Sequence, residues 1–254
     1  MLEINKIYNM DCLEGMDLMI KQGIKVDAII NDPPYGTTNC KWDIAIPFEE
    51  MWDRLKKVRK NERTPIVLFS KQPFTSLLIT SNLDLYKYSL VWKKDNHDNP
   101  LNAKKRFLNI TEDINIFYEK QCLYNPQGII KVDKITKQGR GKSLAQKNER
   151  NSEYIQEYTN YPKNILEFSR DLPNIHPTQK PVALIEYLIK TYTNEGDLVL
   201  DFTIGSGTTA VACLNTNRNY IGFELDNTYY ELAKNRINKH IIDNNLQDKY
   251  NLIA

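Results

Sequence analysis

An acidic residue, two prolines and an aromatic ring stand directly after a short apolar run. The run at 26–30 is rich in β-branched residues and predicts a buried strand, and Asp32, Pro33, Pro34 and Tyr35 follow it. The prolines fix φ at roughly −65° and remove two backbone donors, so the loop is stiff. Its carboxylate and carbonyls can accept hydrogen bonds, and the tyrosine offers a flat face. This combination suits a planar group that carries an amine, such as a nucleobase; a turn with a helix-capping aspartate is the alternative.

A glycine-rich turn between a predicted strand and a predicted helix forms a second group of candidate residues. It follows the strand at 198–200, begins at Asp201, and has a Gly-x-Gly-x-x-Ala core at 205–210. Small residues let the backbone approach a ligand near the start of a helix. Glu224 ends the next strand, 17 positions after Gly207, where a carboxylate can accept both hydroxyls of a ribose. The pattern fits a dinucleotide site as well as a nucleoside site.

The place of this turn in the chain separates those two kinds of site. A dehydrogenase opens its nucleotide-binding half with such a turn and then needs several more strands. Only about 45 residues follow the turn here, which is enough for one strand and one helix. The strands that complete the sheet must therefore come earlier, and one of them carries Asp32. Both strand-end groups then face one crevice at the carboxyl edge of the sheet.

Apolar runs and amphipathic segments alternate along most of the chain. This alternation is typical of a mostly parallel sheet covered by helices. A polar, loose tail is predicted from residue 243, after a helix capped by Asn227 or Thr228. The predicted strands are 4–10, 26–31, 66–70, 86–93, 114–118, 198–200 and 220–223. The predicted helices are 13–22, 47–59, 73–81, 181–192, the segment from the glycine turn to 214, and the segment from the cap to 240.

The periodicity fails between residues 121 and 163, where we predict no regular structure. Seven basic and two acidic residues lie between 131 and 150. A segment this long without structure is usually functional or disordered. A mobile, solvated loop and an insert that tracks phosphates are both compatible with this composition.

The remaining composition narrows the class of protein. The net charge is only +2, so any nucleic-acid surface is a local patch. The four cysteines form no Cys-x-x-Cys pair and the three histidines lie far apart, so we expect no metal site and a reducing, cytoplasmic location. No signal peptide and no membrane-spanning run are recognisable, so we expect no membrane partner.

Five motifs together resemble the S-adenosylmethionine-dependent amino-methyltransferases of DNA, in the permuted order called the β group. Within that family the chain is most similar to compact enzymes of phages and prophages. Phe202 and Thr203 stand where the family has proline and phenylalanine, which places the aromatic packing of the third position in doubt. The matching segments are 32–35 (the catalytic motif), 201–209 (the cofactor loop), 176–181 (a His-Pro element), 9–12 (the cofactor-adenine element) and 112–118 (the late strand beside the target pocket).

The resemblance implies an α/β fold and a division of the chain. The fold is a Rossmann-like, seven-stranded, mostly parallel sheet with one antiparallel edge strand, in permuted order. Residues 1–120 form the catalytic half of the methyltransferase domain and residues 164–254 its cofactor-binding half. Residues 121–163 form a small basic target-recognition insert.

The resemblance also implies S-adenosylmethionine as the cofactor. Glu224 would bind the ribose hydroxyls, Asp201 and Thr178 the amino-acid end, and Asp11 the adenine amine, with helix capping as the alternative role for Asp11. Asp226 would assist Glu224 or simply cap the next helix. The full set of implied cofactor-binding residues is Asp11, Thr178, Asp201, Phe202, Gly205, Ser206, Gly207, Thr208 and Glu224.

The implied catalytic residues are those of the first loop. Asp32 and the Pro33 carbonyl would hold the target amine, and Tyr35 would stack on a base flipped out of double-stranded DNA. Either Phe117 or Tyr118 would close the other face of the base, and the other of these two residues would pack in the hydrophobic core. The methyl transfer would be a direct in-line displacement without a covalent enzyme intermediate.

The target is expected to be the exocyclic N6 of adenine, because an aspartate at the first motif position is associated with adenine in this family. The alternatives are cytosine N4, then a methyltransferase of RNA with the same fold, then a nucleotide-binding oxidoreductase. Whether the chain forms a homodimer, and whether it has a cognate restriction nuclease or acts without one, are questions that the sequence leaves open.

Lys180 would neutralise a carboxylate or a phosphate, or be a surface charge. The candidate DNA contacts are Lys93, Lys94, Lys104, Lys105 and Arg106, with Arg140 as a base reader.

Overall fold

The computed structural model describes residues 1–36, 43–97, 100–137, 153–171 and 179–253. The chain divides into two compact units. The larger unit comprises Met1–Asn125 and Asn164–Ala254, and the smaller one comprises Pro126–Lys163.

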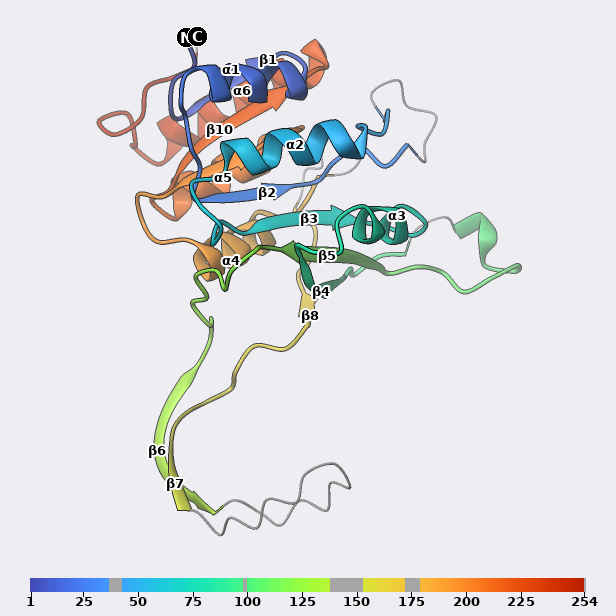
Figure 1. Cartoon of the computed structure of the whole chain (residues 1–254), viewed down its shortest axis with the longest axis vertical. Coiled ribbons are helices and arrows are strands. Elements are labelled where there is room, and N and C mark those ends of the chain that lie inside the picture. The colour runs from blue at the N-terminus through green and yellow to red at the C-terminus, as the bar shows by residue number, and fades with distance from the viewer. Residues whose placement is uncertain (37–42, 98–99, 138–152, 172–178, 254) are drawn as a thin grey trace. The chain divides into compact units, whose positions relative to one another are not determined.

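The larger unit is built on an eight-stranded sheet with the order β1-β10-β9-β2-β3-β5-β4-β8 (Figure 1). Every neighbouring pair is parallel except the two pairs that include β5. The strands are β1 (Lys6–Asn9), β2 (Ala28–Asn31), β3 (Ile66–Ser70), β4 (Tyr86–Lys93), β5 (Thr111–Phe117), β8 (Ile165–Glu167), β9 (Leu198–Asp201) and β10 (Asn219–Glu224).

The mostly parallel sheet is confirmed, and two of its details differ from the expectation. All seven predicted strands are present, but β8 adds an eighth at the edge beside β4. Its three residues are too few to give a recognisable periodicity. The antiparallel strand β5 is not at the edge, because it lies between β3 and β4. Because β5 runs antiparallel to β3 and β4, its N-terminal end lies at the edge of the sheet where those two strands end.

In the part of the chain that the structure describes, six α-helices cover the two faces of the sheet. The core cluster on one face contains apolar residues of α1, α2 and α3, and the cluster on the other face contains those of α4, α5 and α6. In β3, Ile66 and Leu68 belong to the first cluster and Val67 and Phe69 to the second, so this central strand is buried on both sides. The helices are α1 (Cys12–Lys21), α2 (Phe48–Val58), α3 (Phe74–Thr80), α4 (Val182–Tyr192), α5 (Thr208–Asn215) and α6 (Asn227–Asp243).

Two aspartates cap helices directly after a strand. The Asp11 carboxylate accepts hydrogen bonds from the amides of Leu13 and Glu14, at 2.8 and 3.3 Å, at the start of α1. Asp226 caps α6 in the same way, at 2.8 Å from the Thr228 amide. The cap of α6 therefore lies one residue before Asn227 and two before Thr228, the two predicted caps, and the capping role considered for Asp226 is confirmed.

The C-terminal tail is packed rather than loose. Tyr250 and Ile253 are buried in the core, and the Asn238 side chain bonds both the amide and the carbonyl of Ile253, at 2.8 and 2.9 Å. Two apolar side chains in a polar stretch give no periodic signal, which explains the wrong expectation.

The smaller unit contains an antiparallel ribbon of β6 (Ile130–Lys137) and β7 (Glu153–Thr159). The expectation of no regular structure between 121 and 163 is therefore wrong. None of the ribbon residues whose side chains are described is buried, and the paired Ile135 and Ile155 are both two-thirds exposed, so the described ribbon has no buried face and the sequence shows no alternation. Residues 121–125 belong to the larger unit, where Cys122 is buried in the core.

Within the described residues, no helix has the length and apolar character needed to cross a membrane.

Candidate functional site

A cavity of about 310 Å³ lies where β1, β2, β9 and β10 end. These strands are mutually parallel neighbours, so the residues that follow them meet at one edge of the sheet. The helices after β9 and β10 cover one face and those after β1 and β2 cover the other, which opens a crevice between the two groups. Eleven of the thirteen predicted catalytic and cofactor-binding residues line this cavity: Asp11, Asp32, Pro33, Pro34, Tyr35, Asp201, Phe202, Gly205, Ser206, Thr208 and Glu224.

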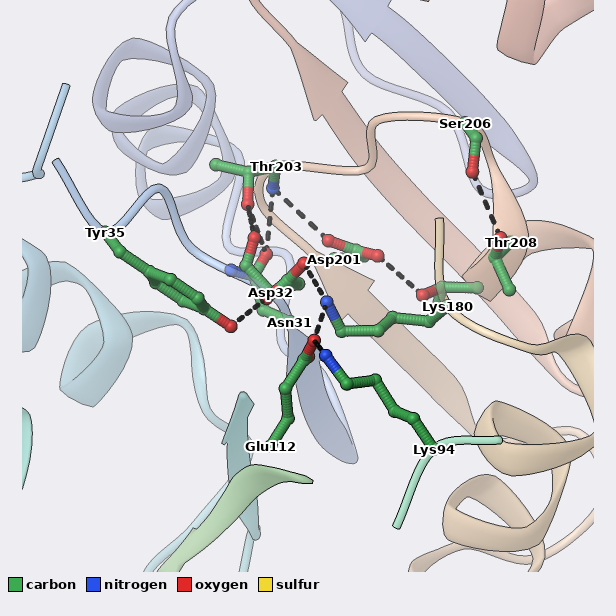
Figure 2. A network of polar contacts seen from close by, with 11 residues as sticks. Asn31, Asp32, Tyr35, Lys94, Glu112, Lys180, Asp201, Thr203, Ser206 and Thr208 are labelled. Carbon is green, nitrogen blue, oxygen red and sulfur yellow. Dashed lines mark hydrogen bonds and ion pairs between the residues drawn. The ribbon is translucent and has the colours of Figure 1, made fainter. Parts of the chain in front are cut away.

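Asp32 follows β2 and is held from three sides (Figure 2). Its Oδ1 accepts a hydrogen bond from the Tyr35 hydroxyl at 2.6 Å, and its Oδ2 forms an ion pair with the Lys180 ammonium. Its backbone carbonyl accepts from the Thr203 hydroxyl at 3.0 Å. Because each carboxylate oxygen has two lone pairs, both oxygens can still accept one further donor.

A buried chain of alternating charges continues from Asp32. The Lys180 Nζ lies 3.2 Å from Glu112 Oε2, and the Lys94 Nζ lies 3.1 Å from Glu112 Oε1 (Figure 2). The two lysine side chains are less than a tenth exposed. Since two cations and two anions alternate, each buried charge has a partner.

Burial and ion pairing act in opposite directions on these carboxyl groups. Burial raises the pKa of Asp32, while Lys180 and the Tyr35 hydroxyl oppose the rise without cancelling it. Burial also acts to raise the pKa of Glu112, but Lys180 and Lys94 together bring it below its ordinary value. The pKa of Lys180 is raised, because its two carboxylate partners outweigh burial. Lys180 and Glu112 therefore stay charged at neutral pH.

The Tyr35 ring is held by an aromatic neighbour. It stacks on Phe74 with ring centroids 5.1 Å apart and an interplanar angle of 27°, and Phe48 packs on the same Phe74 ring at 5.6 Å. Tyr35 lines the cavity as well, so one part of the ring packs on the protein and another faces the crevice.

The glycine turn begins at Asp201, which is almost fully buried. Asp201 Oδ2 accepts from the Thr209 hydroxyl at 2.5 Å and Oδ1 from the Thr203 amide at 3.3 Å. Burial raises the pKa of this carboxyl to about 7 despite these two bonds. The turn then places Gly207 at φ +77° as the N-cap of α5. A Cβ there would lie 3.2–3.3 Å from the side chains of Ile237 and Ala233, so glycine fits both the conformation and the space.

Glu224 at the end of β10 has each carboxylate oxygen bound to one backbone amide. Oε2 accepts from the Gly205 amide and Oε1 from the Asp226 amide, both at 2.9 Å. Burial raises the pKa of Glu224, and these amides oppose the rise. Asn9 at the end of β1 pairs in register with Glu224, which brings Asp11 to the neighbouring strand end.

Sequence reasoning did not predict the roles that four residues have in the site. Thr203 replaces the aromatic residue of the related motif, and its amide and hydroxyl both donate to Asn31 Oδ1, at 2.8 and 3.1 Å. Arg236 of α6 donates to the hydroxyls of Ser206 and Thr208, at 3.2 and 2.9 Å. Glu112 and Lys94 have been described above. Thr203 and Glu112 lie inside matching segments and Lys94 was a candidate DNA contact. Their site partners, like those of Arg236, belong to distant elements, which a local pattern does not show.

The aromatic residues expected beside the target are placed elsewhere. Phe117 is fully buried against Trp52 and Tyr86. Tyr118 is buried in the opposite core cluster. Because β5 is antiparallel to β3, Phe117 pairs with Ile66 at the start of β3. Asp32 lies at the opposite end of the strands, where β2 and β3 finish. The expectation that one of the two faces the base is wrong, and Glu112 occupies the site end of this strand instead.

The candidate DNA contacts divide into several groups. Lys94 is buried and bound to Glu112, so it is not a surface contact. Lys93 is half exposed and pairs with Glu167 at 3.1 Å. Lys104, Lys105 and Arg106 are exposed in the loop between β4 and β5. Thr178 and Arg140 lie outside the described residues, as does the first half of the His-Pro element, residues 176–178. Within the described ranges, no group of three or more potential metal ligands occurs.

The comparisons with known proteins agree on one family. The family model described as DNA methylase (N6_N4_Mtase) matches residues 26–235. The chain is 27% identical to the Type II methyltransferase M1.MboII of Moraxella bovis, over 94% of this chain and 98% of that protein. It is 28% identical to the DNA adenine methyltransferase YhdJ of Escherichia coli strain K12, over 84% and 76%.

Solved structures give the same result. The M1.HpyAVI–SAM complex superposes with a TM-score of 0.63 at 30% identity, over 91% of this chain and 98% of that one. The cytosine-N4-specific PvuII DNA methyltransferase superposes with a TM-score of 0.62 at 16% identity, which indicates a shared fold.

Proposed function

The chain belongs to the DNA methylase family and is an S-adenosylmethionine-dependent DNA methyltransferase; we propose that it methylates the N6 amine of adenine in double-stranded DNA. The observation that carries this proposal is the position of Asp32. Its carboxylate lies in the same cavity as the glycine turn and Glu224, fixed by Tyr35 and Lys180. Adenine is chosen over cytosine because of the Asp-Pro-Pro-Tyr sequence and because one relative, YhdJ, is an adenine methyltransferase.

The residues that line the cavity fit the cofactor by their chemistry. Glu224 has one free lone-pair site on each oxygen, which suits the two ribose hydroxyls, and Asp11 would accept from the adenine amine. Asp201 lies beside the turn and suits the ammonium of the amino-acid end, together with Thr178. Gly205 would let the backbone approach the cofactor, whereas Gly207, which is not among the residues that line the cavity, allows the close packing of α6. Phe202 lines the cavity, and Arg236 orients the hydroxyls of Ser206 and Thr208. When bound, the cofactor supplies an electrophilic methyl group.

Asp32 would orient the amine of the target base. An exocyclic amine is a weak nucleophile because its lone pair is conjugated with the ring. Accepting its hydrogens at Asp32 and at the Pro33 carbonyl favours the tetrahedral nitrogen and stabilises the positive charge that develops on it. The ion pair with Lys180 fixes the carboxylate. Glu112 offsets the charge of Lys180, so the lysine repels the positive charge that develops on the amine less strongly.

Tyr35 would stack on the flipped base from one side. Its hydroxyl bond to Asp32 and its stacking on Phe74 fix the ring in place before the base arrives. Stacking of a base on an aromatic ring contributes about 1–3 kcal/mol, which offsets part of the cost of unstacking in the duplex. Pro33 and Pro34 would keep the loop stiff.

Lys93, Lys104, Lys105 and Arg106 of the larger unit are the proposed phosphate contacts. In the smaller unit, the ribbon of β6 and β7 is the proposed recognition element, and Arg140, which lies outside the described residues, is the proposed base reader. The cytoplasmic location, the similarity to phage enzymes, a homodimer and a partner nuclease stay predictions.

The test separates target binding from cofactor binding. We expect Asp32→Ala to abolish methyl transfer to DNA and to keep the affinity for S-adenosylmethionine, measured by calorimetry, because Asp32 faces the base. Asp84→Ala, an exposed carboxylate at the other edge of the sheet, is the matched control. Loss of cofactor binding in Asp32→Ala would contradict this division of roles.

Methylation-aware sequencing of DNA from cells that express the wild type identifies the base and the recognition sequence together. Methylated cytosine N4 would replace adenine as the target. Measurable NAD binding without S-adenosylmethionine binding would refute the whole proposal.

A further inference from the structure

The loop between β4 and β5 exposes an aromatic ring. Phe107 is fully exposed, and Leu101 in the same loop is nine-tenths exposed. The backbone beside them is ordered, because the turn at Pro100–Asn102 lets the Asn102 carbonyl accept from the amides of Lys105 and Arg106, at 2.8 and 3.0 Å. A short hydrogen-bonded turn therefore presents the phenylalanine to solvent, where the ring gains nothing for folding.

This loop leaves the sheet at the edge that carries the catalytic carboxylate. Lys93 at the end of β4 pairs with Thr111 at the start of β5, and the next residue of β5 is Glu112. Glu112 contacts Lys180, which contacts Asp32, so two ion pairs connect the base of the loop with the site. Figure 1 shows the loop projecting beyond α3, on the side toward which β2 and β3 point.

Three cations stand directly before the ring. Lys104, Lys105 and Arg106 are exposed, and none forms an ion pair with another described residue. Basic side chains of this kind bind the phosphates of a duplex. If these three cations bind the DNA backbone, the Phe107 ring, which follows them directly in the chain, comes against the stacked bases.

Resting on the proposed function, we propose that Phe107 inserts into the DNA at the target base pair and fills the space left by the flipped base. Apolar side chains next to basic ones act as wedges between base steps in other DNA-bending proteins. The inserted ring replaces the stacking lost by the neighbours of the flipped base, so extrusion becomes less unfavourable. Phe107 thus acts on the flipping step and touches neither the cofactor nor the reacting amine.

The experiment uses a duplex oligonucleotide that contains the sequence methylated by the wild type. Phe107→Ala, Phe107→Trp and the control Leu83→Ala are compared; Leu83 is exposed and lies before β4, at the other edge of the sheet. We expect Phe107→Ala to lower kcat/KM by about tenfold or more and to reduce the flipping signal of 2-aminopurine at the target position. Phe107→Trp keeps the wild-type rate, and calorimetry gives the same S-adenosylmethionine affinity for all variants.

A second substrate distinguishes insertion from a general role in DNA binding. In a duplex whose target lies opposite an abasic site, the base is already unpaired, so we expect Phe107→Ala to recover to within about twofold of the wild type. An equal loss on both duplexes, or no loss on either, overturns the inference. A change from dimer to monomer in ultracentrifugation would assign the ring to a contact between copies of the chain and would also overturn it. A wild type that is inactive on every DNA contradicts the proposed function itself.

Discussion

Asp201→Asn tests whether burial raises the pKa of the carboxyl group at the start of the glycine turn. Burial raises the pKa of Asp201 from 3.8 to about 7, more than the bonds from Thr209 and Thr203 lower it. A group whose pKa is higher in the folded state binds its proton more tightly there. Its contribution to stability is therefore full below the unfolded pKa and is lost as the pH rises through about 7.

The size of the effect follows from the two pKa values. At about pH 5.5 the folded state is mostly protonated at Asp201 while the unfolded state is ionised, and at about pH 8.5 both are ionised. The free energy of unfolding should fall by about 2 kcal/mol across this range because of Asp201 alone. An asparagine has no charge to lose, so the Asp201→Asn protein should lack this part of the slope.

Urea unfolding of the wild type and of Asp201→Asn, measured at both pH values without cofactor, gives the two slopes. Burial also raises the pKa of Asp32 and Glu224, and the charges of these two carboxylates contribute to the raised pKa of Asp201. The difference between the two proteins therefore reports Asp201 together with its coupling to Asp32 and Glu224. Asp84→Asn, which replaces an exposed carboxylate, is the matched control. Equal slopes for the wild type and Asp201→Asn would refute the assignment of a raised pKa to this carboxyl.

Two further predictions concern the residues around Asp32. Lys180→Met should lower the free energy of unfolding by about 3–5 kcal/mol, because Asp32 and Glu112 lose their shared buried cation. Adding Asp32→Asn should restore part of the loss in the same unfolding experiment, because it removes the charge left unpaired while Glu112 keeps its ion pair with Lys94. No recovery in the double variant would contradict the charge-chain interpretation. Thr203→Val keeps the shape but removes the hydroxyl that bonds Asn31 and the Asp32 carbonyl, so it should cost about 1 kcal/mol of stability and lower kcat, while calorimetry shows an unchanged cofactor affinity. A weaker cofactor affinity with normal kcat would place the role of Thr203 in the cofactor site.

The candidate site could be predicted where each residue ends a buried strand. Asp32, Asp201 and Glu224 each follow or close a run of apolar residues, and the carboxyl ends of parallel strands meet at one edge whatever the order of the strands. Local sequence therefore determined these positions without knowledge of the tertiary contacts. The seven strands and six helices were predicted for the same reason, since each has a clear local period.

The direction of β5 could not be predicted in the same way. An apolar run has the same pattern in either direction, so the aromatic end of this strand was placed at the site and Glu112 was overlooked. The ribbon of β6 and β7 was missed because it lacks a buried face, and β8 because it is too short. In each case the missing information is which segment pairs with which, and this depends on contacts between residues far apart in the chain.

The anchoring of Asp32 indicates how the two halves of the chain cooperate. Its three partners, Tyr35, Lys180 and Thr203, lie 3, 148 and 171 positions away in the sequence. Two of the three thus come from the half that carries the glycine turn, and Thr203 is part of that turn. Because Thr203 bonds the Asp32 carbonyl directly, the glycine turn helps to fix the position of the loop that carries the catalytic carboxylate. The same bonds explain why the two sites need not be adjacent in sequence: a permuted chain order preserves the function as long as the strand ends still meet at this edge.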